Sequence, residues 1–216
     1  MSSLDVACEK RGVTLSVVMI VRDEAAILPR FLAAGRELWD ELAVMDTGSV
    51  DETVNLLTEA GAKVGHMEWP GNFAVARNAA LELATGDWVL VLDADEIVSP
   101  EFVAEVRTLI SRSDFGAATV TMRNLFTNGH HRDSRLLRLF RRDPDLRYEH
   151  AIHEEIAGSV GVMLARTGQS IGHVAAPVQH VGYLKDRAAE RAKLDRDRNI
   201  LEQLIKEDPS DTYSRF

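Results

Sequence analysis

Short apolar runs alternate with helix-like segments through the first hundred residues of the chain. The runs at 15–21, 42–45, 62–67 and 88–92 are short and read as strands, and the first is rich in β-favouring residues. The last run is continuously apolar, which is typical of a central strand that is buried on both faces. Strands that alternate with helices predict a mainly parallel sheet with helices on both of its faces.

Local signals place the helices between these runs. Pro29 suits the first turn of a helix that carries Phe31, Leu32, Leu38 and Trp39 on one face. Ser49 to Glu52 fits a capping box that opens the next helix, which Gly61 ends. A third helix is expected over 73–84, closed by Gly86, and a fourth begins at Ser99-Pro100.

The rhythm changes after residue 115. Runs at 117–122, 136–140 and around Ile152 look like strands without long helices between them, so antiparallel strands are expected in this half. Residues 185–207 form a charged helical pattern. The predicted fold class is α/β, with a mixed and mostly parallel Rossmann-like sheet that is flanked by helices.

These patterns divide the chain into one domain over 1–184 and a helical extension over 185–216.

Composition narrows the function classes. The 216 residues are 45% hydrophobic and 27% charged, which suits one α/β domain with a proper core. The formal net charge is −9 and no basic stripe is present, so a nucleic-acid partner is disfavoured.

Targeting signals are equally sparse. Cys8 is the single cysteine and forms no internal disulfide, which favours a reducing compartment. The run at 15–21 is too short for a transmembrane segment, and residues 1–14 do not resemble a signal peptide. A cytoplasmic location is predicted, with peripheral membrane association left open and no prediction of oligomeric state.

The strongest chemical signal follows the buried run at 88–92. Asp93 and Asp95 come directly after it, where open α/β sheets bind their ligands. In an extended chain these two side chains point the same way, so both carboxylates are expected to face one divalent cation. A cation held there can grip a diphosphate.

Other acidic residues end neighbouring strands. Asp23 and Glu24 follow the first strand, and Asp46 follows the second. No glycine-rich dinucleotide fingerprint follows the first strand, and no Walker-type element occurs. A dinucleotide enzyme and a nucleoside triphosphatase are therefore disfavoured.

Four ordered motifs resemble the family 2 glycosyltransferases, whose fold is GT-A. They cover residues 15–112 and are Ser16 to Glu24, Asp46-Thr47-Gly48-Ser49-Val50-Asp51, Trp69 to Asn78 with its Ala76-Arg77-Asn78 helix start, and the Asp-x-Asp strand of Asp87 to Glu96. Weaker similarity continues through Leu139-Phe140-Arg141, Ile152-His153-Glu154 and His180-Val181-Gly182-Tyr183. The resemblance implies that 15–112 is the nucleotide-binding half of the domain and 113–184 its acceptor-side half. In the subgroup that the chain most resembles, tetratricopeptide-like repeats often follow. Asp208-Pro209 to Phe216 looks like the start of such a repeat segment, cut short.

The resemblance implies a nucleotide-sugar donor and a divalent metal, Mg²⁺ or Mn²⁺, held by Asp93 and Asp95. Asp46 would accept a hydrogen bond from the nucleotide base, most simply uracil, while a turn residue is the structural alternative. Asp23 and Glu24 would line the base pocket, and Arg77 would contact the nucleotide or its phosphates. The structural alternative for Asp23 and Glu24 is a helix N-terminus that acidic residues stabilise, and for Arg77 it is a surface arginine on a helix.

The resemblance also points to the catalytic base in the Ile-His-Glu region. Glu154 is the candidate for deprotonating the acceptor hydroxyl, with Glu155 in reserve. His180 is the candidate third metal ligand and His153 the other, each against a structural histidine as the alternative.

Three functions follow in order. The first is an inverting glycosyltransferase that moves a sugar from a nucleoside diphosphate, with UDP the expected nucleotide, to a glycan, lipid or protein acceptor. The second is a nucleotide-sugar-binding module without catalysis. The third is a metal-dependent nucleotidyltransferase, although Arg22 to Ala25 lacks the glycine-rich loop that such enzymes usually carry.

Overall fold

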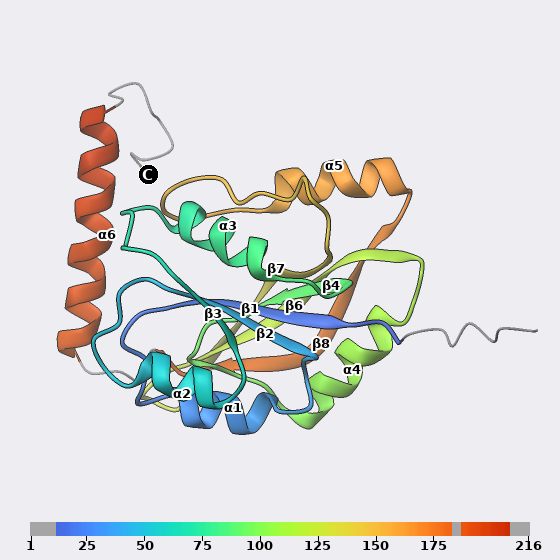
Figure 1. The fold of residues 1–216 in the computed structure, drawn as a ribbon, viewed down its shortest axis with the longest axis horizontal. Helices are drawn as coiled ribbons and strands as arrows, with labels where there is room; N and C mark the ends of the chain where they lie inside the picture. Colours follow the sequence, from blue (N-terminus) through green and yellow to red (C-terminus); the bar gives the residue numbers. More distant parts are fainter. Residues whose placement is uncertain (1–11, 183–186, 208–216) are drawn as a thin grey trace, which may run out of the picture.

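The computed structural model describes residues 12–182 and 187–207, without the side chains of 187–193 and 207. Cys8, Tyr183 and the predicted repeat start at 208–216 lie outside the described residues. Within the described residues, one eight-stranded sheet forms the centre of the molecule, with helices on both sides (Figure 1).

The strands lie in the order β3-β2-β1-β4-β7-β6-β8-β5. Strands β3, β2, β1 and β4 are parallel, β7 runs antiparallel to both β4 and β6, β8 is parallel to β6, and β5 is antiparallel to β8. The predicted fold class, a mixed and mostly parallel sheet, is confirmed. Their bounds are β1 Leu15–Val21, β2 Glu41–Asp46, β3 Lys63–His66, β4 Trp88–Val91, β5 Glu96–Ile97, β6 Phe115–Leu125, β7 His131–Arg141 and β8 Ser170–His180.

The helices form two layers and one separate element. In Figure 1, α3 and α5 lie above the sheet, α1, α2 and α4 lie below it, and α6 stands beside it at the left of the view. Each layer has its own apolar cluster against the sheet. The bounds are α1 Leu28–Gly35, α2 Thr53–Glu59, α3 Phe73–Leu83, α4 Pro100–Ile110, α5 Ala157–Thr167 and α6 Arg187–Glu207.

The first half of the fold follows its local signals. All four residues of β4 are buried, as the continuous apolar run predicts. Pro29 lies in the first turn of α1, and Ser99 caps α4 by accepting the amide of Phe102 at 3.2 Å. The carboxyl ends of the parallel strands consequently meet along one edge, where the acidic motifs are.

The predicted capping box at Ser49 is wrong. Helix α2 begins four residues later, and its N-cap residue Glu52 makes no side-chain cap bond. Ser49 instead accepts the backbone amide of Asp23 at 3.0 Å. The hydroxyl thus joins the loop after β1 to the loop after β2. Leu38 and Trp39 likewise fall beyond α1, which ends at Gly35.

The second half departs further from the sequence reading. The strand expected around Ile152 is a loop, closed by an isolated bridge between Glu149 and Glu155. An eleven-residue helix, α5, follows and was not predicted, since Gly158 and Gly161 lower its helix propensity. Tertiary packing stabilises the helix, because Val160 and Met163 are buried in the apolar cluster between this helix and the sheet.

Candidate active site

The Asp-x-Asp segment forms a turn. Beyond β4, the amide of Glu96 donates to the carbonyl of Asp93 at 3.0 Å. The expectation of an extended chain through Asp93 and Asp95 is therefore wrong, because the chain turns at residues 94 and 95. A cation shared by the two carboxylates stays a prediction. Asp93 contacts arginines, and Asp95 contacts a histidine.

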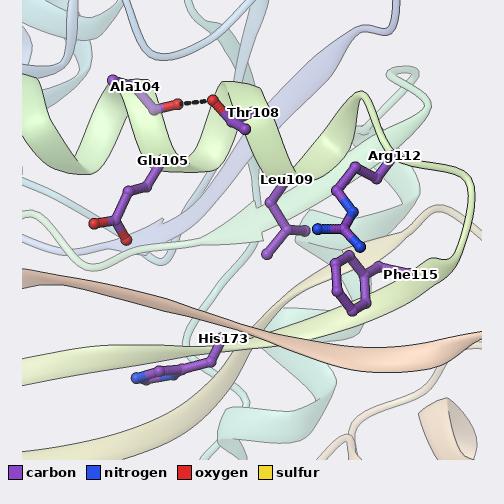
Figure 2. A pocket seen from close by; sticks show the side chains of 7 residues that line it. All are labelled: Ala104, Glu105, Thr108, Leu109, Arg112, Phe115 and His173. Carbon is purple, nitrogen blue, oxygen red and sulfur yellow. Dashed lines mark hydrogen bonds between the residues drawn. The ribbon is translucent and has the colours of Figure 1, made fainter.

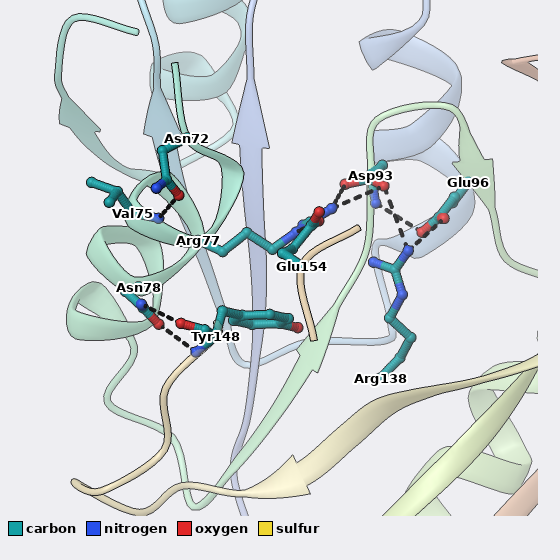
Figure 3. Close-up of polar contacts among 9 residues, drawn as sticks. All are labelled: Asn72, Val75, Arg77, Asn78, Asp93, Glu96, Arg138, Tyr148 and Glu154. Atoms are coloured by element: carbon teal, nitrogen blue, oxygen red, sulfur yellow. Dashed lines mark hydrogen bonds and ion pairs between the residues drawn. The ribbon is translucent and has the colours of Figure 1, made fainter. Parts of the chain in front are cut away.

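Arg77 joins the turn to a distant loop (Figure 3). Its Nη2 donates to Oδ1 of Asp93 at 3.0 Å, and its Nε donates to Oε1 of Glu154 at 2.7 Å. Asn72 caps α3 by accepting the amide of Val75 at 3.0 Å, which fixes the start of the helix that carries Arg77. The structure thus brings together three residues that the sequence analysis assigned to the site.

A second arginine, missed in the sequence analysis, lies on the other side of Asp93. Arg138 of β7 places Nη2 3.7 Å from Oδ2 of Asp93 and 3.5 Å from Oε1 of Glu96. Glu96 is buried, and its Oε2 accepts the backbone amide of Asp93 at 2.8 Å. A charged residue inside the apolar run Leu136 to Phe140 was the available signal for Arg138.

These contacts separate the pKa values of two neighbouring carboxyl groups. Burial alone would raise the pKa of Asp93, but the charges of Arg77 and Arg138 lower it to about 2. Burial raises the pKa of Glu96 to about 7, against the lowering effect of Arg138. Asp93 is therefore the group of this network that stays ionised at neutral pH. Glu96 is buried beside it and accepts its backbone amide.

Tyr148 packs against the guanidinium group of Arg77. Its ring lies 5.9 Å from the guanidinium carbon of Arg77. Asn78, one position after Arg77, donates to the carbonyl of Tyr148 at 3.0 Å and accepts its amide at 2.8 Å. The Ala76-Arg77-Asn78 motif therefore uses Asn78 to fix the chain that leads to Glu154.

Asp95 pairs with the predicted ligand His180. Nε2 of His180 lies 3.5 Å from Oδ2 of Asp95, and Nδ1 lies 2.7 Å from the amide oxygen of Asn124. That oxygen can only accept, so Nδ1 carries the proton and Nε2 presents its lone pair toward Asp95 unless the ring is charged. Two electron-rich atoms that face each other favour a cation between them, either a proton or a metal.

Gly182 keeps the space beside this pair open. A Cβ atom there would lie 2.3 Å from Oδ2 of Asp95 and 2.8 Å from Nε2 of His180. The carboxylate and imidazole donors suit Mn²⁺ or Mg²⁺. Among the described residues, however, no three His, Cys, Asp or Glu side chains form a metal-binding group. The donor atoms of Asp95 and His180 are of the kind that such an ion prefers, and the metal role of Asp93, Asp95 and His180 stays a prediction.

Asp46 and Asp23 hold two loops together. The carboxylate of Asp46 accepts the amides of Gly48 and Ser49 at 3.2 Å, and His66 Nδ1 lies 3.6 Å from its Oδ2. Oδ1 of Asp23 accepts the amide of Val50 at 2.8 Å. These contacts are those of the structural alternative, a turn residue for Asp46, and the base-binding role of both residues stays a prediction.

The remaining candidates lie around this edge. The amide of Glu24 donates to Oγ1 of Thr53 at 2.8 Å, which places Glu24 at the entry to α2. Glu155 is exposed and uses its backbone to pair with Glu149. His153 is exposed, with φ 53°. Glu155 and His153 thus lie on the same loop as Glu154.

A separate groove lies beside α4, on the side of the sheet opposite α3 (Figures 1 and 2). It has a volume of about 370 Å³, and Glu105 and His173 are the acidic and imidazole groups on its wall. Oε2 of Glu105 accepts the amides of Ala175 at 2.7 Å and Ala176 at 3.1 Å, which gives it a structural task. The groove takes no part in the arginine and carboxylate network.

Comparison with known proteins decides the family. The family model described as glycosyl transferase family 2 matches residues 16–166, which include β1 from its second residue, β2 to β7 and the whole network around Arg77. The chain belongs to this family. The family 2 glycosyltransferase motifs at the ends of β1, β2 and β4 and at the start of α3 are the ones that converge on this edge.

Two curated relatives are similar to this family 2 glycosyltransferase over most of its length. It is 42% identical over 202 residues to a "TPR repeat-containing protein" of Synechococcus elongatus, with 92% of this chain and 50% of the relative covered. It is 23% identical over 208 residues to the SPbeta prophage-derived glycosyltransferase SunS of Bacillus subtilis, with 91% and 46% covered. The chain spans about half the length of both relatives. The first name agrees with the predicted subgroup that carries tetratricopeptide-like repeats.

Solved structures confirm the GT-A fold. Glucosyl-3-phosphoglycerate synthase from Mycobacterium tuberculosis, in complex with Mn²⁺ and UDP-glucose, matches with TM-score 0.62 and 20% identity over 90% of this chain and 79% of that chain. The mannosyltransferase PcManGT from Pyrobaculum calidifontis, in complex with GDP-mannose and Mn²⁺, matches with TM-score 0.60 and 16% identity over 92% and 65%. Within the described residues of this chain, no helix is long and apolar enough to cross a membrane.

Proposed function

We propose that this family 2 glycosyltransferase transfers a sugar from a nucleoside diphosphate donor, with UDP the expected nucleotide, to an acceptor hydroxyl and inverts the anomeric centre. The observation that carries the proposal is the position of Arg77 between Asp93 and Glu154. It ties the acidic turn after β4 to the loop that bears the candidate base. The Asp95 and His180 pair supplies a second functional group beside the same turn.

Arg77 is suited to an anionic donor. Its side chain is buried, and its Nη1 has no hydrogen-bond partner among the described residues. A buried donor without a partner is costly, and a phosphate oxygen would satisfy it. Arg77 is therefore proposed to hold the diphosphate while it keeps Asp93 and Glu154 in place.

Asp95 and His180 are proposed to hold Mn²⁺ or Mg²⁺, with Asp93 as a further candidate ligand. A divalent ion bound there supplies positive charge for the departing diphosphate. The two solved relatives above were crystallised with Mn²⁺ and a nucleotide-sugar, which supports this assignment. Asp23, Glu24 and Asp46 are proposed to line the base pocket, because their loops interlock at the ends of β1 and β2.

Glu154 is proposed as the base. Its Oε1 accepts from Arg77, and the described residues give its Oε2 no hydrogen bond. Oε2 can therefore take the proton of the acceptor hydroxyl. The freed oxygen attacks the anomeric carbon while the bond to the diphosphate breaks, and this single displacement inverts the centre.

The test is release of nucleoside diphosphate from UDP-glucose, UDP-N-acetylglucosamine and GDP-mannose, with Mn²⁺ or with EDTA. Release that needs Mn²⁺ and is lost in Asp95→Ala, but kept in the exposed control Asp145→Ala, is the expected result. Bound nucleotide should also raise thermal stability, by about 2.7 kcal/mol at a hundredfold excess over Kd. Full activity of Asp95→Ala would overturn the metal assignment, and pyrophosphate release from a nucleoside triphosphate would favour a nucleotidyltransferase.

A further inference from the structure

The loop that carries Glu154 has an uncommon backbone. Glu149 and Glu155 close it by exchanging two backbone hydrogen bonds, at 2.9 and 3.1 Å. Inside this closed loop, His150 has φ 70° and His153 has φ 53°. Residues with side chains seldom occupy this left-handed region, and they stay there when the surrounding structure holds them. The loop therefore needs support from outside itself.

Part of that support comes from the start of α3. Ala151 and Ile152, at the tip of the loop, are only 7% and 5% exposed. The carbonyl of Ala151 accepts the amide of Phe73 at 2.8 Å, and Trp69 and Phe73 pack against the same apolar cluster. Phe73 lies one helical turn before Arg77, so the loop tip and the arginine share one supporting element.

The rest of the support comes from α6. Ile200 is buried in the same cluster as Ala151 and Ile152, with Leu201 and Leu204 packed beside it. Arg196 adds a cation–π contact, with its guanidinium carbon 5.0 Å from the ring centre of Phe73. The apolar face of α6 is thus used to cover the tip of the Glu154 loop.

The chain that leads into α6 also contacts the proposed metal pair. The amide of Val181 donates to the carbonyl of Asp95 at 3.0 Å, and Gly182 lies against Asp95 and His180. Helix α6 begins at Arg187, a few residues later, and stands beside the sheet in Figure 1. Residues 181–182 therefore contact the proposed metal pair, and Ile200 of the helix that follows contacts the tip of the Glu154 loop.

We propose that α6 positions the base, and that Ile200 is the positioning residue, acting through Ile152. This inference rests on the proposed role of Glu154. With the cluster intact, Ile152 is fixed, the two left-handed histidines are held, and Glu154 stays on Arg77. With the cluster opened, the loop relaxes and Glu154 leaves the position from which it can take a proton. The other proposed donor and metal contacts, Arg77 with Asp93 and Asp95 with His180, do not involve residues 149–155 and are expected to remain.

The test compares Ile200→Ala with Leu194→Ala, which alters a 64% exposed leucine on the same helix. Nucleoside diphosphate release is followed with Mn²⁺ and whichever of UDP-glucose, UDP-N-acetylglucosamine and GDP-mannose the wild type turns over. Ile200→Ala should lower kcat by about tenfold or more and leave the donor KM unchanged, because only a reacting group is misplaced. Leu194→Ala should change neither, and Ile200→Val, which keeps most of the contact, should retain most of kcat.

Hydrogen exchange gives a readout that does not need turnover. The amides of residues 149–155 should exchange faster in Ile200→Ala, while those of β1 and β4 should not change. Unchanged exchange at 149–155, or an equal loss of kcat in Leu194→Ala, would overturn the inference. If the wild type releases no nucleotide, the proposed function fails, and the exchange experiment still decides whether α6 holds the loop.

Discussion

Arg77 donates from Nε to Oε1 of Glu154 at 2.7 Å, although the two residues are 77 positions apart in the sequence. The same guanidinium reaches Asp93 through Nη2 at 3.0 Å. Burial opposes the charge on Arg77, but the nearby carboxylates of Asp93 and Glu154 raise its pKa and keep it charged. One permanent cation on α3 thereby orients two carboxylates that come from separate parts of the chain.

Replacement of the candidate base should stop turnover without unfolding the site. Glu154→Gln keeps the shape of the side chain and a group that can face Arg77, but it cannot accept the proton of the acceptor. We expect a loss of about 10²- to 10⁴-fold in nucleoside diphosphate release. Thermal stabilisation by UDP with Mn²⁺ should remain.

Glu155→Gln is the matched control, because Glu155 is the exposed neighbour and contributes its backbone to the bridge with Glu149. It should keep wild-type release. A large loss in Glu155→Gln together with an active Glu154→Gln would reverse the two assignments.

Gly182 should be essential to the proposed metal pair although it supplies no ligand atom. In Gly182→Ala, the added Cβ would fall 2.3 Å from Oδ2 of Asp95, so the carboxylate must move. We expect weaker stabilisation by Mn²⁺ with UDP, measured as the thermal shift at a series of Mn²⁺ concentrations.

The control for this substitution is Gly161→Ala, at an exposed position of α5 where an added Cβ meets nothing within 4 Å. It should leave the Mn²⁺ response unchanged and raise the free energy of unfolding by about 0.5–1 kcal/mol, the usual gain of alanine over glycine in a helix. An unaltered Mn²⁺ response in Gly182→Ala would contradict the placement of the metal.

The buried partners of Asp93 should matter for stability. Arg138→Gln removes one of the cations that face Asp93 and Glu96, and breaking such a buried group typically costs about 3 kcal/mol. Adding Glu96→Gln should recover part of this loss, because a neutral amide does not need the cation. Urea denaturation of the single and double variants measures both effects.

An exposed ion pair supplies the comparison. Arg166→Gln breaks a pair with Asp143 in which the arginine is 55% exposed, and such surface pairs contribute less than about 1 kcal/mol. A cost for Arg138→Gln as small as that for Arg166→Gln would mean that the network around Asp93 is not a structural centre.

Glu41 should make stability depend on acidic pH. Burial alone would raise the pKa of its carboxyl, but hydrogen bonds from Ser16 and Thr85 outweigh burial and lower it below the ordinary value of 4.5. Because the folded pKa is below the unfolded one, this stabilisation is complete above the unfolded pKa and is lost as the pH falls through the folded pKa. Glu41→Gln should therefore flatten the decline in unfolding free energy on acidification, measured by urea titration from neutral to acidic pH. The exposed Glu59→Gln should keep the wild-type decline.

The first half of the molecule was predictable because its signals are local. The run Trp88 to Leu92, the Ser99-Pro100 start and the glycine at 61 mark a strand, a helix start and a helix end within a few residues. Alternation of such elements predicts a parallel sheet, and a parallel sheet gathers its carboxyl ends on one edge. That is why Asp23, Asp46 and Asp93 could be assigned to one edge before the structure was known.

The second half depends on contacts between distant residues, which leave weaker traces in the sequence. Helix α5 carries Gly158 and Gly161 and is held by packing on the sheet. Arg138 looks like an interruption of an apolar strand until Glu96 and Asp93 are placed beside it. The sequence around Ile152 resembles a strand because it contains apolar residues. In the structure these residues lie in a loop, and they are buried against α3 and α6.

The sequence by itself determined the fold class, the family and the edge of the sheet where the chemistry lies, because strand and helix patterns and short motifs act over a few residues. Only the tertiary structure decided how the groups are paired: Asp93 with two arginines, Asp95 with His180, and Glu154 with Arg77. The physical reason is the turn after β4. It directs neighbouring carboxylates to different partners, and those partners come from β7, β8 and α3.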